Sequence, residues 1–318
     1  MGRWEKFVES IKNADVMGDS QDAVDLVDDG DLEKALLYVN EKLKAKPKSA
    51  GLLFTKGTIL DDMERPYEAL ECYDKVLEIN PDDENAIYNK VVIQISATDK
   101  IQEGLNTLKL LPKERQNETS FLRIKADALV ELEKFKESEK ICEEILKKEP
   151  DDTFTLMIYT NSCYARKNYE RALELTNKIL EVDPTDVATL GNKADLFNRL
   201  GRSEESLKIT ESLISRNSMD DLAWANKGTA LLLRSEYEKS ISSLQTAVKI
   251  DPAFAEAWFD LAKAYACVNN EDDALDSLIV ATSIDSDYLN ELEDSYFDNI
   301  KNHPRFQKLV SKQKDQVN

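Results

Sequence analysis

The sequence predicts an all-α array of helix-turn-helix units that repeat every 34 residues. Three features predict it: the spacing of prolines, small residues at two fixed places in each unit, and turn-forming residues between the paired helices. Pro47 and Pro81 lie 34 residues apart, and so do Pro150 and Pro184. A proline just past a helix end stops that helix, so these residues mark the ends of every second helix. Later steps of 34 reach Ser218, Pro252 and Ser286.

Counting back from each mark divides most of the chain into eight units. The predicted units are 16–49, 50–83, 84–118, 119–152, 153–186, 187–220, 221–254 and 255–288, all of 34 residues except the third, which has 35. A repeat array must be sealed at both ends by segments with a polar outer face. We therefore predict an N-terminal capping helix over residues 1–15, and a C-terminal capping helix with a polar tail over 289–318.

Both predicted caps carry apolar residues at helical spacing. Trp4, Phe7, Val8 and Ile11 follow the i, i+3, i+4, i+7 pattern of one helix face. At the other end, the sequence from Phe297 to Leu309 is interrupted by Pro304 and supplies Ile300 and Phe306 as further apolar residues. A membrane-surface helix is the other interpretation of the first segment, through Trp4 and Phe7.

Small residues recur where two helices of a unit would pack closely. They occupy the eighth place of most units and the twentieth place of nearly all. The eighth-place residues are Ala23, Gly57, Ala126, Ala194, Gly228 and Ala262, and the twentieth-place residues are Ala35, Ala69, Ser138, Ala172, Ser206, Ser240 and Ala274. Small side chains let paired helices approach, while larger ones fill the flanks. Gly30, Gly201 and Asn269 fall at the fifteenth place, where a helix ends in the left-handed conformation that these residues tolerate.

The third unit departs from the pattern. It needs one extra residue to bring Gly104 to the small place, and Pro112 is expected to end its second helix about a turn early. We expect residues 113–118 to form a longer loop. An irregular but ordinary repeat is the favoured interpretation, and a hinge between two subarrays is the alternative.

These residues resemble the tetratricopeptide repeat family. Its pattern W-x2-L-G-x2-Y, followed by A-x3-F, is closely matched in the eighth unit by Trp258, Leu261, Ala262, Tyr265 and Ala274. The resemblance covers residues 16–288. It implies a right-handed superhelical solenoid with the first helix of each unit lining a concave groove. Family members bind peptides or partner helices there, through places two, five, six, nine, twelve and thirteen.

Those places supply the candidate binding residues. They are Phe54, Tyr88, Asn89, Arg123, Asp127, Asn192, Asp195, Arg199, Asn226, Phe259, Asp260 and Lys263. Three asparagines share place six and would form a ladder for a peptide main chain, because an amide both donates and accepts. Asparagine is also common in the family consensus, and we weigh the two explanations equally. The aromatic residues are candidate anchors, since aromatic side chains dominate interface energetics.

The charges at these places favour a partner with basic character. Eight acidic residues stand against three basic ones: Asp28, Asp61, Asp62, Asp127, Glu131, Asp195, Glu256 and Asp260 against Arg123, Arg199 and Lys263. The co-chaperones of the family need lysine or arginine at several groove places to clamp a C-terminal carboxylate. Only Arg123 meets that requirement here, so we predict no binding of chaperone tails.

Composition excludes several classes of function. The net charge is −20, from 62 acidic and 42 basic residues, which disfavours nucleic acid and anionic membranes. The four cysteines form no C-x-x-C pair, and no run of 18 apolar residues occurs. With no secretory leader apparent, we expect a cytoplasmic protein with buried, reduced thiols.

No constellation for catalysis is apparent. His303 is the only histidine, so a nucleophile would have a single candidate base, and a zinc site would lack its usual ligands. Acidic pairs such as Asp151-Asp152 sit where carboxylates cap helices. We therefore expect no enzyme, no metal and no cofactor, and a scaffold or adaptor that binds other proteins. The alternatives are a self-associating assembly protein, and so a homo-oligomer, or a peptide-responsive sensor.

Overall fold

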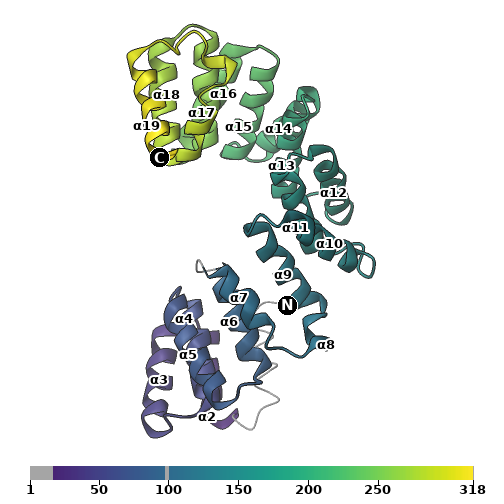
Figure 1. Ribbon diagram of the computed structural model, residues 1–318, viewed down its shortest axis with the longest axis vertical. Coiled ribbons are helices and arrows are strands. Elements are labelled where there is room, and N and C mark those ends of the chain that lie inside the picture. Colours follow the sequence, from purple (N-terminus) through teal and green to yellow (C-terminus); the bar gives the residue numbers. More distant parts are fainter. Residues whose placement is uncertain (1–16, 97–99, 318) are drawn as a thin grey trace. The chain divides into compact units, whose positions relative to one another are not determined.

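The computed structural model describes residues 17–96 and 100–317, and in these ranges every regular element is helical. The chain divides into two compact units, one ending at Pro150 and one beginning at Asp151. The division does not fall at the irregular third repeat. Figure 1 shows the helices of each unit following one another as antiparallel pairs.

The helices of the first unit are α2 (Met17–Asp28), α3 (Leu32–Ala45), α4 (Ala50–Asp62), α5 (Pro66–Ile79), α6 (Glu84–Ser96), α7 (Ile101–Leu108), α8 (Lys113–Gln116), α9 (Thr119–Glu131) and α10 (Phe135–Leu146). Those of the second unit are α11 (Thr153–Ala165), α12 (Tyr169–Val182), α13 (Val187–Arg199), α14 (Ser203–Arg216), α15 (Asp221–Leu233), α16 (Tyr237–Ile250), α17 (Ala255–Cys267), α18 (Glu271–Ile284), the 3₁₀ helices η1 (Ser286–Glu291) and η2 (Ser295–Phe297), and α19 (Pro304–Val317). The all-helical repeat architecture predicted from the sequence is confirmed. The division into eight repeats stays our proposal, and the predicted N-terminal cap lies outside the described residues.

Acidic and hydroxyl side chains start several of these helices. Asp152 accepts a hydrogen bond from the backbone N–H of Thr155, and Asp220 accepts one from Ala223. Ser49 caps α4 through the N–H of Leu52. These bonds satisfy N–H groups that have no partner inside the helix. At least in this pair, the acidic dipeptide 151–152 serves as a helix cap, as expected.

The turns between paired helices share one backbone conformation. Gly30, Gly201 and Asn269 have positive φ, as their residue types predicted. Four further turns place a larger residue in the same conformation: Glu64, Glu133, Lys167 and Ser235. In the turn after α13, the N–H of Gly201 donates to the carbonyl of Asn198, and the N–H of Arg202 donates to that of Phe197. This pair of bonds is the usual left-handed end of a helix.

Close packing inside a pair depends on the small residues. A Cβ added to Gly228 on α15 would lie 2.4 Å from Leu244 Cγ on α16. The Ser240 hydroxyl, also on α16, donates to the carbonyl of Gly228 at 2.8 Å. Ser138 makes the equivalent bond to Ala126 at 2.7 Å in the first unit. Ser138 and Ser240 thus both permit the approach of the paired helices and tie them together, whereas the buried hydroxyl of Ser206, at the same place, has no hydrogen-bond partner among the described residues.

The third repeat is irregular in a way that the sequence predicted only in part. Its second helix, α7, has eight residues and ends at Leu108, so the early end is confirmed. The expected loop over residues 113–118 is wrong for most of its length, because Lys113–Gln116 form the one-turn helix α8. Pro112 has φ −54° and ψ 147°, an extended geometry that ends one helix and leaves the next turn free to begin.

Residues after the last repeat seal the second unit. Phe297, Ile300 and Phe306 are buried in one cluster with Phe259 and Leu278. The closing α-helix, α19, begins at Pro304 and is therefore shorter than the apolar pattern suggested, since Phe297 lies in η2 and Ile300 in the following turn. η1 and η2 also supply Tyr288, Glu291 and Tyr296 to one wall of a cavity in the second unit.

Candidate functional site

The asparagines of the expected ladder are largely engaged by the fold. Asn226 is 5% exposed, and its side-chain amide donates to the carbonyl of Gly191 at 3.1 Å. The amide of Asn89 donates to the hydroxyl of the buried Tyr73 at 3.1 Å. Asn192 is exposed. Asn226 is thus corrected from a ladder member to a structural residue, because place six there lies between neighbouring first helices.

The aromatic candidates pack against the core to different degrees. Phe259 is 1% exposed, with its ring centroid 4.6 Å from that of Tyr288 and 5.5 Å from that of Phe297. It was expected as an exposed anchor, and that expectation is wrong because η1 and η2 cover it. In the first unit, Phe54 and Tyr88 are half-buried in edge-to-face pairs.

Two charged candidates of the first unit lie on α9. Arg123 pairs with Glu149 at 3.0 Å between Nη2 and Oε2. Burial, and secondarily the Glu131 carboxylate, raises the pKa of Asp127 above its usual range. Both side chains are half-buried on the first helix of the fourth predicted repeat.

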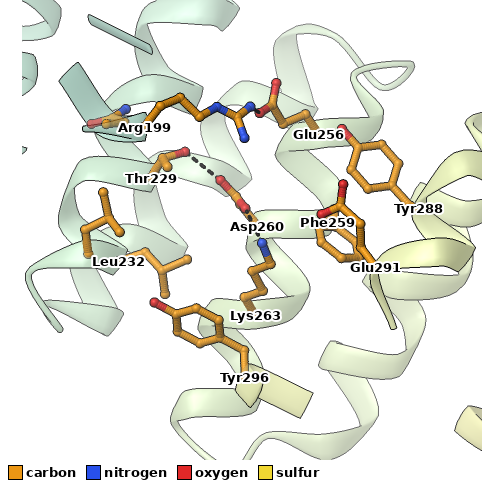
Figure 2. Close-up of a pocket in the computed structure, with 12 residues that line it drawn as sticks. Arg199, Thr229, Leu232, Glu256, Phe259, Asp260, Lys263, Tyr288, Glu291 and Tyr296 are labelled. Carbon is orange, nitrogen blue, oxygen red and sulfur yellow. Dashed lines mark hydrogen bonds and ion pairs between the residues drawn. The ribbon is translucent and has the colours of Figure 1, made fainter. Parts of the chain in front are cut away.

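The second unit brings four candidates together around a single cavity of about 190 Å³ (Figure 2). Arg199, Phe259, Asp260 and Lys263 line it. The other lining residues are Asn198 from α13, Thr229, Leu232 and Leu233 from α15, Glu256 from α17, Tyr288 and Glu291 from η1, and Tyr296 from η2. Asn192, Asp195 and Asn226 are not among them. All nine lining residues from α13, α15 and α17 occupy the inward places two, five, six, nine, twelve and thirteen.

One cation of the cavity reaches across it. Arg199 on α13 pairs with Glu256 on α17, and also with Asp195 at 3.2 Å on its own helix. Figure 2 shows the Arg199 side chain extended toward Glu256, with Tyr288 beside that carboxylate. The Arg199–Glu256 ion pair thus links the first helices of the sixth and eighth predicted repeats, α13 and α17. In sequence, α15 of the seventh predicted repeat lies between them.

The other cation lies deeper, between two carboxylates. Lys263 Nζ is 3.5 Å from Asp260 Oδ1 and 3.3 Å from Asp294 Oδ2, and it lies 4.5 Å from the centre of the Phe259 ring. Asp260 also accepts a hydrogen bond from Thr229 at 2.6 Å. Burial alone would lower the pKa of Lys263, but Asp260 and Asp294 outweigh it and raise that pKa.

Among the groups that line the cavity, Glu256 is the one whose pKa is raised to near neutral pH. The Glu256 side chain is 40% exposed, and this partial burial, followed by repulsion from Asp260, raises the pKa of its carboxyl to about 7. Arg199 and Lys263 oppose the shift, while Asp195 adds to it. Tyr288 also faces this group, and its own pKa is raised by burial and then by the Glu256 carboxylate. Near neutral pH, then, the charge on this wall of the cavity can change.

Sequence reasoning missed the cavity residues that follow α18. Tyr288, Glu291 and Tyr296 come from η1 and η2. Tyr288 is the last residue of the eighth predicted unit, and Glu291 and Tyr296 lie in the segment that we expected only to cap the array. The available signal was composition: residues 285–297 are rich in acidic and aromatic side chains. A segment that only covers the apolar end of an array needs apolar residues on its inner face, and this segment has many acidic residues as well.

Nowhere in residues 17–96 or 100–317 do three or more His, Cys, Asp or Glu side chains gather as metal ligands would. A helix with the length and apolarity needed to cross a membrane is likewise not found in that part of the chain.

Two family models match the sequence. One is described as a tetratricopeptide repeat and matches residues 50–83, and the other is described as a TPR repeat and matches residues 228–266. Among curated proteins, none matches the chain. The tetratricopeptide fold suggests a protein-protein interaction scaffold.

Solved structures with related helical arrangements include three informative cases. A tetratricopeptide repeat protein from Parabacteroides merdae is 17% identical, with 97% of each chain covered and a TM-score of 0.46. The Cut9-Hcn1 hetero-tetramer of APC/C is 17% identical, over 92% of this chain and 58% of that chain, with a TM-score of 0.49. MamA from Desulfovibrio magneticus is 17% identical, over 52% of this chain and 94% of that chain, with a TM-score of 0.44. At such identities, nothing known of those proteins transfers to this one.

Proposed function

Since this chain is a tetratricopeptide repeat protein, we propose that it is a non-catalytic scaffold that binds a segment of another protein along the first helices of its second unit. The segment is extended or helical and has basic character. Tetratricopeptide repeat proteins are generally non-catalytic scaffolds, and no reaction is proposed for the groups around the cavity.

One observation carries the proposal. The inward faces of α13, α15 and α17 supply nine residues to one cavity, and these residues mix apolar, hydrogen-bonding and charged side chains. Binding sites commonly combine an apolar lining with a few well-placed polar groups. The second unit has further exposed apolar side chains at inward places. These are Phe154 and Met157 on α11, and they would add apolar contacts for a bound segment.

The carboxylates near the cavity set the expected charge of the partner. Complementary charge steers association and suppresses wrong partners, and salt screens it. We therefore expect the affinity for the partner segment to fall when the salt concentration is raised.

The test uses a library of random peptides displayed on phage and selected on the full chain. Selected peptides are synthesised, and their affinity is measured for the wild-type chain and for Leu233→Trp. Leu233 lines the cavity and is 44% exposed, so a larger side chain should fill the cavity without disturbing the core. We expect at least a tenfold loss of affinity.

The matched control is Ile284→Trp. Ile284 has a similar exposure, 41%, but lies at the end of α18 outside the cavity. Peptides that bind Leu233→Trp as well as they bind the wild type would place the binding surface elsewhere. Failure to select any peptide, together with a dimer mass in light scattering, would favour the self-associating alternative.

A further inference from the structure

The cavity in the second unit has the size of one side chain. Its volume of about 190 Å³ is below the range of roughly 300–1,000 Å³ typical of sites for drug-sized ligands. An occupant of this size is a single side chain of a bound segment rather than a separate small molecule.

The charges around the cavity are unbalanced in favour of carboxylates. Two cations, Arg199 and Lys263, stand among the carboxylates Asp195, Glu256, Asp260, Glu291 and Asp294. Each cation already contacts two of these carboxylates. After burial, which acts in the opposite direction, Asp260 and Asp294 dominate the pKa of Lys263, and the more distant Glu291 also helps to raise it. Charge complementarity therefore favours a cationic occupant over an anionic one.

One buried hydrogen-bond acceptor of a cavity-lining residue lacks a donor. Asn198, 4% exposed, gives its amide N–H to the carbonyl of Asn226, while its Oδ1 accepts no bond from any described residue. A buried acceptor without a donor is unfavourable. An arginine side chain carries five donors and no acceptor, so it matches this imbalance as well as the charge.

Arg199 already shows how a guanidinium is held here. It lies between Asp195 and Glu256, with its guanidinium 5.8 Å from the centre of the Tyr164 ring. Its side chain is 39% exposed and that of Glu256 is 40% exposed. Exposed ion pairs of this kind contribute no more than about fivefold to an equilibrium constant. A second guanidinium can therefore displace the first at low cost.

We propose that this cavity binds one arginine side chain of the partner segment, which takes the place of Arg199 on Glu256. The inference deepens the proposed function and rests on it for the biological source of the side chain. Arg199 then acts as an internal competitor. Its removal strengthens binding, and the removal of the Glu256 charge weakens it.

The probe is N-acetyl-arginine amide, titrated into the full chain and followed by NMR chemical shifts. We expect binding in the millimolar range, since a single exposed charge contact contributes little affinity. The neutral isostere N-acetyl-citrulline amide should bind at least tenfold more weakly. Arg199→Gln should bind the arginine probe up to about fivefold more tightly, and Glu256→Gln up to about fivefold more weakly.

The matched control is Arg202→Gln, which removes a nearby arginine whose partner is Glu205 outside the cavity. It should leave the affinity unchanged. Arg199→Met, which retains the apolar stem, replaces Arg199→Gln if that variant melts early. Because a general loss of structure would weaken binding in every variant, a gain in affinity on removing Arg199 separates competition from a structural role.

Two results would overturn the inference: equal binding of the arginine and citrulline probes, or an Arg199 variant that binds no more tightly than the wild type. Peptides selected on the chain that bind at the cavity without any basic residue would also overturn it, while leaving the proposed scaffold intact. If the arginine probe binds as expected but no peptide can be selected, the proposed function fails and the cavity assignment stands.

Discussion

Gly228 offers the most direct test of how the paired helices determine this fold. In the structure a Cβ at this position would lie 2.4 Å from Leu244 Cγ, 2.8 Å from Cδ2 and 3.3 Å from Cδ1. Leu244 is completely buried, so it has no free space to move into. The perturbation is therefore Gly228→Ala, which adds one methyl group at the closest approach of α15 and α16.

The sign of the effect follows from two opposing contributions. Alanine is favoured over glycine inside a helix by about 1 kcal/mol. Overpacking a well-packed core costs about 1–3 kcal/mol. The clash involves a branched carbon close to the backbone, so relief requires the helices to separate, which would also stretch the bond from Ser240 to the Gly228 carbonyl. We expect a net destabilisation of about 1–2 kcal/mol.

The assay is hydrogen exchange on the full chain. Repeat arrays need not unfold in one step, so a single melting temperature is a poor measure. The free energy of local opening should fall for amides of α15 and α16 and stay unchanged for amides of α4 and α5. A stabilised α15 would show that Leu244 yields easily and would refute the packing argument.

A second background separates the clash from other causes. Leu244→Ala removes the obstructing atoms and should itself cost about 2–5 kcal/mol. In that background the added methyl group meets open space, so Gly228→Ala should become neutral or stabilising by up to about 1 kcal/mol. Destabilisation of the same size in both backgrounds would rule out Leu244 as the reason for the glycine.

Two further predictions follow from the turns and from the cavity. Ser235 has φ 60°, so Ser235→Gly should stabilise the α15–α16 pair by about 1 kcal/mol in the same exchange measurement, whereas no gain would mean that its conformation carries no strain. The pKa of Glu256 is raised to about 7, so the carboxyl gains its charge as the pH rises from 6 to 8, and the affinity for N-acetyl-arginine amide should increase over that interval. Glu256→Gln should remove this increase, and its persistence in the variant would assign the titration to another group.

The architecture was predictable because the repeat imposes its conformation on whichever residue occupies a place. Gly201 and Asn269 revealed the left-handed turn through their residue type. Glu133, Lys167 and Ser235 adopt it without any such preference, since the two packed helices on either side fix the turn. Periodicity is thus a stronger guide than the local propensity of a single residue. Periodicity fails as a guide at Pro112, where α7 has already ended and the separate one-turn helix α8 begins within the same predicted repeat.

The candidate site was predictable only up to the last repeat. The inward places singled out Arg199, Asp260 and Lys263, and the structure shows that these three residues line one cavity. They could not show that Phe259 is covered, because its exposure depends on the segment that follows the array. Asn226 was misread for a related reason: a side chain at an inward place can turn toward the adjacent helix and bond its backbone.

The end of the array has a chemistry that interior repeats cannot supply. Within an array, the inward face of each repeat is bordered by another repeat, and the available side chains are those at the six inward places. The eighth predicted repeat is bordered instead by η1 and η2, which add Tyr288, Glu291 and Tyr296 to the same cavity. Glu291 adds a carboxylate to the lining, and the two tyrosines add aromatic rings with hydroxyl groups. The lining of this cavity is therefore set jointly by the inward repeat places and by η1 and η2, and a groove predicted from periodicity alone omits the second contribution.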